Sequence, residues 1–572
     1  MRATRLLIPL LLFGMVIMPS QADEAIYSAR DIFHPVFAEN GMVSSQEALA
    51  TKIGVDVLER GGNAVDAAVA VGFALAVTLP RAGNLGGGGF MLIHSAEDDE
   101  TIAIDFRETA PAGAHRDMFL DADGNVVTMR SRFTHLAVGT PGSVAGLALA
   151  AERYGTMPLA ELIEPAIELA EQGFTVTPDL ATSLAALRHR MEPWPASRAI
   201  FFDETGEPLG IGATLVQTDL AWSLRQIAEN GPDAFYDGPI AERIVAEMES
   251  GGGLITRDDL RNYAPTLREP VRGSYRGHEI ISMPPPSSGG VHVIQILNVL
   301  EGIELAELGH NSAAAIHHLA EAMKLAYADR SEYLGDPDFV DVPVEALIDK
   351  DYARELRDGI DPSRARPAAE IRPGLSLPYE SNDTTHYSVM DGAGNVVATT
   401  YTINFSYGSG IVADGTGILL NNEMDDFSAK PGVPNAFGLI GGDANAVEPG
   451  KRPLSSMTPT LLRRDGEIIL ATGSPGGSHI ITTVLQILLN VIDHDMNIAA
   501  ASAAPRIHHQ WLPDELRVEV GISEDTLRLL RSLGHDVEVR NAMGGTQSIM
   551  RGPNGFYGAS DPRRPGALTL GH

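Results

Sequence analysis

The stretch N-D-T-T-H-Y-S-V-M, residues 382–390, is the part of the sequence around which the predicted fold is organised. Its Thr-Thr pair precedes an alternating run that places Tyr387 and Val389 on one face, which predicts the start of a β-strand. In the simplest interpretation, Thr384 is a β-branched residue that suits a pleated sheet. A second interpretation concerns the chemistry of that threonine.

A threonine at the N-terminus of a chain carries a nucleophilic hydroxyl and, in its own α-amine, a base. The unperturbed pKa of an α-amine is about 7.7–8.0, so much of it is neutral near working pH. An internal threonine has no such amine, so the bond between Asp383 and Thr384 would have to be cut first. Residues 359–383 hold several prolines and charges without periodicity, which predicts an exposed loop before that bond.

The composition is that of a globular protein with an acidic surface. The chain has 572 residues, of which 44% are hydrophobic and 20% charged, and a formal charge of -33. Such a charge argues against binding to nucleic acid or to an anionic membrane, and it is compatible with solubility at high salt. The absence of cysteine excludes disulfides, thiol chemistry and cysteine-ligated metals.

The first residues resemble an export signal. Arg2 and Arg5 precede an apolar run at 6–18, and Ser20-Gln21-Ala22 offers a small-x-small cleavage pattern. We therefore expect 1–22 to be a signal peptide and the mature chain to begin at Asp23. An uncleaved anchor is the alternative, although the run is short for a membrane span.

The chain changes character along its length. Helices with a 3.6-residue apolar repeat are predicted at 143–154, 158–172, 219–230, 240–250, 291–300 and 313–329. After Thr384 strands dominate, beginning with a hairpin over 385–402. The glycine cluster at 84–90 lacks the spacing of a P-loop, which favours close backbone packing over a ligand loop.

The turn G-S-P-G-G-S at 473–478 joins a predicted strand, 467–472, to an apolar helix, 480–493. Such a junction presents backbone N–H groups at a helix N-terminus, as an oxyanion hole requires, but it would equally suit phosphate. Two histidine pairs could suggest a metal. His317 and His318 lie on adjacent helix faces, however, and 508–509 has no third ligand at a sensible spacing, so we expect no metal and no cofactor.

Four motifs together resemble one known family. They are T-T-H-Y-S-V at 384–389, N-N-E-M-D-D-F-S at 421–428, K-R-P-L-S-S-M at 451–457 and G-S-P-G-G-S at 473–478. Their order and spacing resemble those of the γ-glutamyltranspeptidases, or glutathione hydrolases, of the N-terminal nucleophile hydrolase class. The resemblance covers essentially the whole mature chain. The bacterial branch is the most similar, because 431–442 resembles its lid loop.

The resemblance implies an α/β (α+β) fold, the four-layer αββα sandwich of this class. It also implies a precursor that folds and then cuts itself between Asp383 and Thr384. The products would be a large subunit, 23–383, and a small subunit, 384–572, that remain intertwined in one unit.

The resemblance also implies roles for single residues at the reacting end of the site. Thr384 corresponds to the nucleophile, and Thr402 to the second threonine that orients the freed amine. Gly476 and Gly477 correspond to the oxyanion donors, whose loss typically lowers the rate about 10²- to 10³-fold.

At the other end, a γ-glutamyl group carries an α-carboxylate and an α-ammonium. Such a zwitterion needs a cationic fork at one end and carboxylates at the other. By the resemblance, the carboxylate clamp corresponds to Arg107, Ser455 and Ser456, and the ammonium site to Asn404, Glu423 and Asp426.

Two residues depart from the family pattern. Glu423 stands where close bacterial relatives often have glutamine, which adds a carboxylate facing the ammonium and should be tolerated. Phe437 stands where the lid commonly has tyrosine, whose hydroxyl can bond to the residue matching Asn404. Phenylalanine covers the site without that bond, which puts lid closure and the balance of hydrolysis against transfer in doubt.

The expected activity is formation of a γ-glutamyl–threonine ester from glutathione or a related amide, followed by transfer to water, an amino acid or a peptide. After removal of its signal the protein would be periplasmic or secreted, with no membrane partner. The alternatives are a cephalosporin or glutaryl acylase of the same class, and an exported binding protein that never matures.

Overall fold

The residues that follow Thr384 form the middle of a seven-stranded antiparallel sheet. β10 (Thr385–Asp391) and β11 (Val396–Thr402) make the predicted hairpin. The sheet has the order β21-β2-β10-β11-β3-β4-β7. Its outer members are β21 (Leu568–Gly571), β2 (Gly41–Ser45), β3 (Gly88–Ser95), β4 (Glu100–Phe106) and β7 (Thr266–Arg268).

A second seven-stranded antiparallel sheet packs on the first, with the order β1-β20-β19-β15-β14-β9-β8. Its strands are β1 (Val36–Ala38), β20 (Gly555–Ser560), β19 (Gln547–Gly552), β15 (Glu467–Thr472), β14 (Thr460–Arg464), β9 (His278–Ser282) and β8 (Val271–Tyr275). The predicted large and small segments both contribute strands to both sheets, so the two segments are interleaved.

This computed structural model describes residues 31–371, 384–430 and 442–572. The predicted signal peptide 1–22, Asp383 of the predicted cleavage bond, and Phe437 of the predicted lid all lie outside the described residues. Within the described ranges, no helix combines the length and hydropathy needed to cross a membrane.

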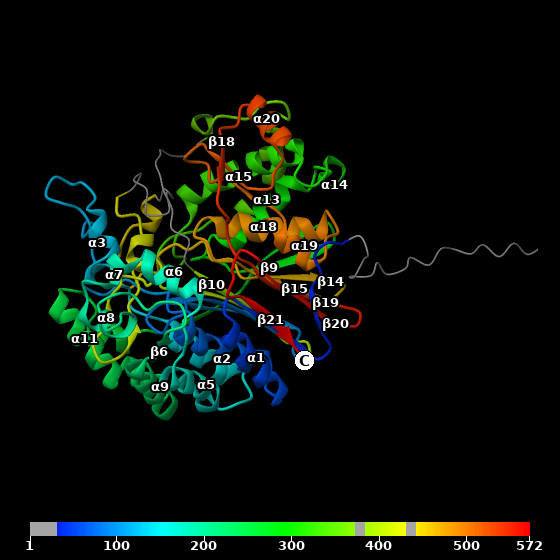
Figure 1. Cartoon of the computed structure of the whole chain (residues 1–572). Coiled ribbons are helices and arrows are strands. Elements are labelled where there is room, and N and C mark those ends of the chain that lie inside the picture. The colour runs from blue at the N-terminus through cyan, green and yellow to red at the C-terminus, as the bar shows by residue number, and fades with distance from the viewer. Residues whose placement is uncertain (1–30, 372–383, 431–441) are drawn as a thin grey trace, which may run out of the picture.

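Helices cover the outer face of each sheet, which makes four layers in the order helix, sheet, sheet, helix (Figure 1). The predicted αββα fold is therefore confirmed. Against the first sheet lie α1 (Ala48–Glu59), α2 (Ala64–Thr78) and α4 (Ser143–Tyr154), with α5 (Leu159–Gln172), α9 (Thr218–Asn230) and α11 (Pro239–Gly251) farther out. Over the second sheet lie α13 (Gly289–Leu300), α15 (Ala313–Tyr333), α17 (Lys350–Asp358), α18 (His479–Ile492), α19 (Ile498–Ala503) and α20 (Glu524–Ser532).

Shorter elements complete the chain. The strands are β5 (Phe174–Thr175), β6 (Thr214–Leu215), β12 (Val412–Ala413), β13 (Ile418–Leu419), β16 (Ile507–His508), β17 (Leu516–Glu519) and β18 (Val537–Arg540). The helices are α3 (Thr128–Arg132), α6 (Pro178–Ala186), α7 (Arg188–Met191), α8 (Pro195–Phe201), α10 (Asp233–Tyr236), α12 (Arg257–Arg261), α14 (Leu305–Leu308) and α16 (Val344–Leu347).

The central helix α2 explains how the first sheet is held. All of its residues are buried, and many are alanine, so the helix approaches β10 and β11 closely. Asn63 caps it, because its side-chain oxygen accepts the N–H groups of Val65 and Asp66. Tyr387 and Val389 of β10 pack on this side.

The opposite face of β10 is polar although it is buried between the sheets. His386 hydrogen-bonds through its two ring nitrogens to Thr400 Oγ1 at 2.8 Å and Ser388 Oγ at 3.0 Å. The Ser388 hydroxyl then donates to the carbonyl of Gln547 in β19, at 3.0 Å. The alternation of residues 386–389 thus separates a helix-facing apolar side from a polar seam that joins the two sheets.

Candidate active site

Thr384 lies at the start of β10, beside the last residue of β11. The strand register pairs Thr385 with Tyr401, so Thr384 and Thr402 are neighbours across the hairpin. The Thr384 hydroxyl donates to Thr402 Oγ1 over a long 3.5 Å, and this oxygen also accepts the N–H of Asn404 at 2.9 Å. The backbone therefore fixes Thr402 next to Thr384, where the predicted orienting role requires it.

Asn404 turns the chain out of β11 in the left-handed region, with φ of 69°. Asparagine adopts this conformation more readily than most residues. Its Nδ2 donates to the carbonyl of Asn422 at 2.9 Å, and Asn422 Oδ1 accepts the N–H of Phe405 at 3.1 Å. These bonds join the loop after β11 to the loop that carries the acidic residues of the site.

The glycine cluster at 84–90 packs directly against β11. A Cβ atom on Gly87 would lie 2.0 Å from the carbonyl oxygen of Thr402, and one on Gly89 would lie 2.5 Å from that of Thr400. No side chain fits at either distance. The prediction of close backbone packing is therefore confirmed, and the cluster supports the strand end that carries Thr402.

The turn at 473–478 connects β15 to α18, as predicted. Gly476 and Gly477 have φ of 132° and 55°, a region that suits glycine. Among the described residues, neither of their N–H groups donates a hydrogen bond. Free N–H groups at a helix N-terminus can stabilise a developing oxyanion. Gly477 lines the same pocket as Thr384, whereas Gly476 is not among the lining residues.

Arg107 follows β4 directly, and its side chain is fully buried. The guanidinium forms ion pairs with Glu423 and, at 2.5 Å, with Asp426. It also donates to the carbonyls of Pro453 at 3.3 Å and Leu454 at 3.4 Å. The sequence suggests separate cationic and acidic ends, but the structure places them in contact. Adjoining groups suit an α-amino acid, because its ammonium and carboxylate share one carbon.

Three buried carboxylates surround this guanidinium. Burial, opposed by Arg107, raises the pKa of Glu108 to about 7 and raises the pKa values of Glu423 and Asp426 as well. Burial by itself lowers the pKa of Arg107, but Glu423, Asp426 and Glu108 together raise it. The site thus holds more acidic groups than cations, which favours a ligand that brings an ammonium.

Ser455 and Ser456 present their hydroxyl groups to the pocket. The Ser455 carbonyl accepts both the N–H and the hydroxyl of Ser288, each at 2.8 Å, which fixes the loop. Ser455 Oγ accepts the N–H of Met457 at 3.1 Å, and Ser456 Oγ accepts an N–H of Arg330 at 3.1 Å. Neither hydroxyl donates to another described residue, so both protons can point to a ligand.

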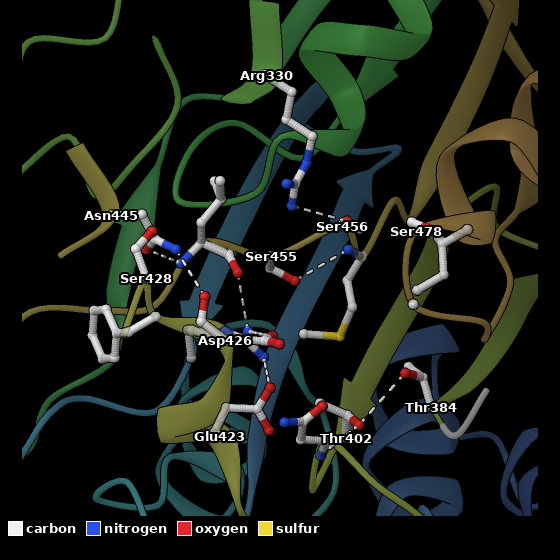
Figure 2. A pocket seen from close by; sticks show the side chains of 17 residues that line it. Arg330, Thr384, Thr402, Glu423, Asp426, Ser428, Asn445, Ser455, Ser456 and Ser478 are labelled. Carbon is white, nitrogen blue, oxygen red and sulfur yellow. Dashed lines mark hydrogen bonds and ion pairs between the residues drawn. The ribbon is translucent and has the colours of Figure 1, made fainter. Parts of the chain in front are cut away.

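These groups meet in a single pocket of about 550 Å³ (Figure 2). Figure 2 shows Thr384 and Thr402 on one side of it, with Glu423 and Asp426 farther along and Arg330 reaching in from a helix. Of the predicted site residues that the structure describes, all but Gly476 line this pocket: Arg107, Thr384, Thr402, Asn404, Glu423, Asp426, Ser455, Ser456 and Gly477.

Sequence reasoning missed other residues of the pocket wall. Asn445 holds two loops together, because its Nδ2 donates to the Asp426 carbonyl at 2.8 Å and its Oδ1 accepts the Leu454 N–H at 2.9 Å. Arg330 lies in α15, seven residues after the buried Met323. A charge at a position of the apolar repeat was the signal that could have revealed it.

The structure brings His317 together with Glu321 and His535, a group that could hold a metal ion. These atoms already have partners: Glu321 forms an ion pair with Lys324 at 2.6 Å, and the two ring nitrogens of His317 contact His535 and the carbonyl of Asp361, each at 2.8 Å. The polar groups are satisfied by protein, so we assign no metal to them.

Two layered sheets between helices, with a threonine at the start of a central strand facing the pocket, define the N-terminal nucleophile hydrolase class. The family model for γ-glutamyltranspeptidases matches residues 50–570. The chain therefore belongs to the γ-glutamyltranspeptidase family, and it is an enzyme.

Relatives agree with this assignment. The chain is 61% identical over 544 residues to the glutathione hydrolase proenzyme of Escherichia coli K12, covering 95% of this chain and 93% of the relative. Among solved structures, the cephalosporin acylase of Bacillus halodurans has a TM-score of 0.82 at 29% identity, covering 97% of this chain and 99% of its own. A solved chain of Helicobacter pylori γ-glutamyltranspeptidase has a TM-score of 0.57 at 48% identity, covering 61% of this chain and 97% of its own.

Proposed function

We propose that this enzyme is a self-processing γ-glutamyltransferase and glutathione hydrolase. The observation that carries the proposal is the single pocket that holds Thr384 together with an acidic ammonium site and two serine hydroxyls. Its substrates would be glutathione and related γ-glutamyl amides, with water, amino acids or peptides as acceptors.

Maturation would begin with attack of the Thr384 hydroxyl on the carbonyl carbon of Asp383. The acyl group moves from nitrogen to oxygen, which leaves an ester on Thr384 and a free α-amine. Water then hydrolyses the ester, so that 23–383 ends in a carboxylate and 384–572 begins with the amine. The Helicobacter pylori chain supports this division, because it matches about three fifths of the sequence with nearly its whole length, the share that 23–383 would have.

In the mature enzyme, the Thr384 hydroxyl attacks the γ-carbonyl carbon of the donor while its own α-amine takes the proton. Thr402 orients that amine. The N–H groups of Gly476 and Gly477 stabilise the oxyanion of the tetrahedral intermediate. Its collapse expels the leaving amine, which takes the proton, and forms the γ-glutamyl–threonine ester. Water or an acceptor amine then attacks the ester by the same route and releases Thr384.

Donor specificity follows from the charges of the pocket. Glu423 and Asp426 would bind the α-ammonium with the help of the Asn404 amide. Arg107 and the hydroxyls of Ser455 and Ser456 would hold the α-carboxylate. Both sets line the pocket beside Thr384, so a γ-glutamyl group would present its carbonyl to the hydroxyl.

A cephalosporin or glutaryl acylase is the second candidate, and the likeness to the acylase of Bacillus halodurans favours it. A glutaryl group has no ammonium, so an acylase pocket has no use for three acidic groups around Arg107. Comparing the release of 4-nitroaniline from γ-glutamyl and glutaryl anilides separates the two. We expect the γ-glutamyl donor to be preferred, and a preference for glutaryl would overturn the proposed donor.

Maturation is tested on a denaturing gel with N-terminal sequencing. The purified protein should give two bands, with N-termini at residue 23 and residue 384, which tests export to the periplasm or medium at the same time. Thr384→Ala should leave one inactive band. If this variant is still cut before residue 384, the nucleophile is misassigned. A wild-type protein that stays whole would instead support an exported binding protein.

A further inference from the structure

Arg330 is a buried cation in the pocket wall that the mechanism above does not use. It comes from the last turn of α15, and its guanidinium reaches down toward Ser456 (Figure 2). The residue is only 4% exposed and lines the same pocket as Thr384.

Arg330 has no carboxylate partner among the residues that the structure describes. Its Nε donates to Ser288 Oγ at 2.8 Å and a terminal N–H donates to Ser456 Oγ at 3.1 Å, so both of these partners are neutral hydroxyls. Burial lowers the pKa of Arg330 to about 10. Other buried arginines of this chain are paired with acids: Arg107 with Glu423, and Arg506 with Asp561.

An unpaired buried charge is costly, and it is retained where an anionic ligand supplies the missing partner. The positive charge of Arg107 is less available to a ligand than that of Arg330. All three of its nitrogens already donate, to Glu423, to Asp426 and to two backbone carbonyls. The guanidinium beside the two serines that makes no ion pair with a described carboxylate is therefore that of Arg330, on which Asp426 acts only from beyond contact distance.

The contact with Ser456 has a direction. Arg330 has only donors, so Ser456 Oγ must be the acceptor. The hydroxyl proton of Ser456 is then turned away from Arg330 and is free to be donated. Ser455 Oγ likewise accepts the N–H of Met457, which leaves the Ser455 hydroxyl proton free to be donated. Both serines thus stand ready as donors, which suits a carboxylate and does not suit an ammonium.

We propose that Arg330 is a positioning residue for the α-carboxylate of the donor: it holds Ser456 as a hydrogen-bond donor and adds its unpaired positive charge to that end of the pocket. This inference rests on the proposed function. It predicts that Arg330 raises kcat/KM only for donors that have an α-carboxylate.

The test compares two anilide donors that differ only in that group, γ-glutamyl 4-nitroanilide and 4-aminobutyryl 4-nitroanilide. The wild-type enzyme is read first and should prefer the γ-glutamyl donor; if it does not, the proposed function fails before any variant is read. Arg330→Met should lower kcat/KM for the γ-glutamyl donor about 10- to 100-fold, the range for a lost hydrogen bond to a charged group, mainly through KM. For 4-aminobutyryl, which has no α-carboxylate for Arg330 to act on, the change should stay within about 3-fold.

Two further variants separate positioning from support of the fold. Arg330→Lys keeps the charge without the two-pronged geometry, so it should restore part of the lost selectivity. If Arg330→Met fails to mature, the comparison of the two donors is made with Arg330→Lys instead. Ser288→Ala removes the hydroxyl that accepts Arg330 Nε and donates to the Ser455 carbonyl, so it should lower kcat/KM for the γ-glutamyl donor more than for 4-aminobutyryl. Equal losses for the two donors in the Arg330 variants, or no loss for either, would overturn the inference.

Discussion

The Thr402→Val substitution tests how the nucleophile is held. Valine keeps the β-branched shape that suits the end of β11 and removes only the hydroxyl. Among the described residues, that hydroxyl contacts Thr384 Oγ1 at 3.5 Å and the N–H of Asn404 at 2.9 Å. Its loss therefore acts on catalysis and on stability by separate routes.

The magnitudes follow from those contacts. Without Thr402 Oγ1, the buried N–H of Asn404 has no acceptor, which destabilises the fold by about 1–3 kcal/mol. Loss of the proposed hydrogen bond that orients the Thr384 amine should raise the activation free energy by a similar amount. We therefore expect kcat to fall about 10- to 100-fold, since 1.4 kcal/mol corresponds to a factor of ten in rate. KM should change little, because Thr402 touches the reacting end and not the zwitterion.

The assay is release of 4-nitroaniline from the γ-glutamyl donor by fully matured enzyme, checked on a denaturing gel. Urea unfolding is measured in the Thr384→Ala background, so that maturation does not alter the chain being compared. Thr402→Ser is the matched control, because serine keeps the hydroxyl, and it should stay within a few-fold of wild type. If the valine and serine variants are equally active, the assigned role of Thr402 is wrong.

Three further predictions concern the pocket and its support. Glu423→Gln should raise the thermal midpoint by a few degrees, because it removes one of the buried acids that crowd around Arg107. The KM for the donor should change less than about tenfold, since Asp426 remains to bind the ammonium. A larger rise in KM would show that the extra carboxylate is required. Because burial raises the pKa of Glu108 to about 7, the folded chain keeps a proton that the unfolded chain releases above its usual pKa, so stability should fall as pH rises from about 4.5 to 7. Glu108→Gln should flatten that slope in urea titrations, and an unchanged slope would refute the assignment. Gly87→Ala should prevent correct folding or maturation, because the new Cβ would lie 2.0 Å from the carbonyl oxygen of Thr402. A variant that is processed normally would contradict this close packing.

The helices of the first half show what local patterns can predict. The repeat at 143–154 matches α4 residue for residue, and the side chain of Asn63 caps the helix that follows it. These features depend on neighbours within a few residues, where periodicity and capping chemistry are decisive. Several ends differ: α15 continues to Tyr333, four residues past its predicted end, and α11 includes Gly251, so that Gly252 takes the left-handed cap position.

The sequence by itself determined the family, and its four spaced motifs predicted Thr384 as the nucleophile and about half of the residues that line the pocket, because that information lies in the order of the residues. Only the tertiary structure decided how the charges pair. Arg107 meets Glu423, which lies 316 positions away, and Arg330 meets Ser456, 126 positions away. No local pattern encodes such contacts, because they form only when separate layers pack together. Burial in those layers then sets which charge is compensated and which is left for a ligand.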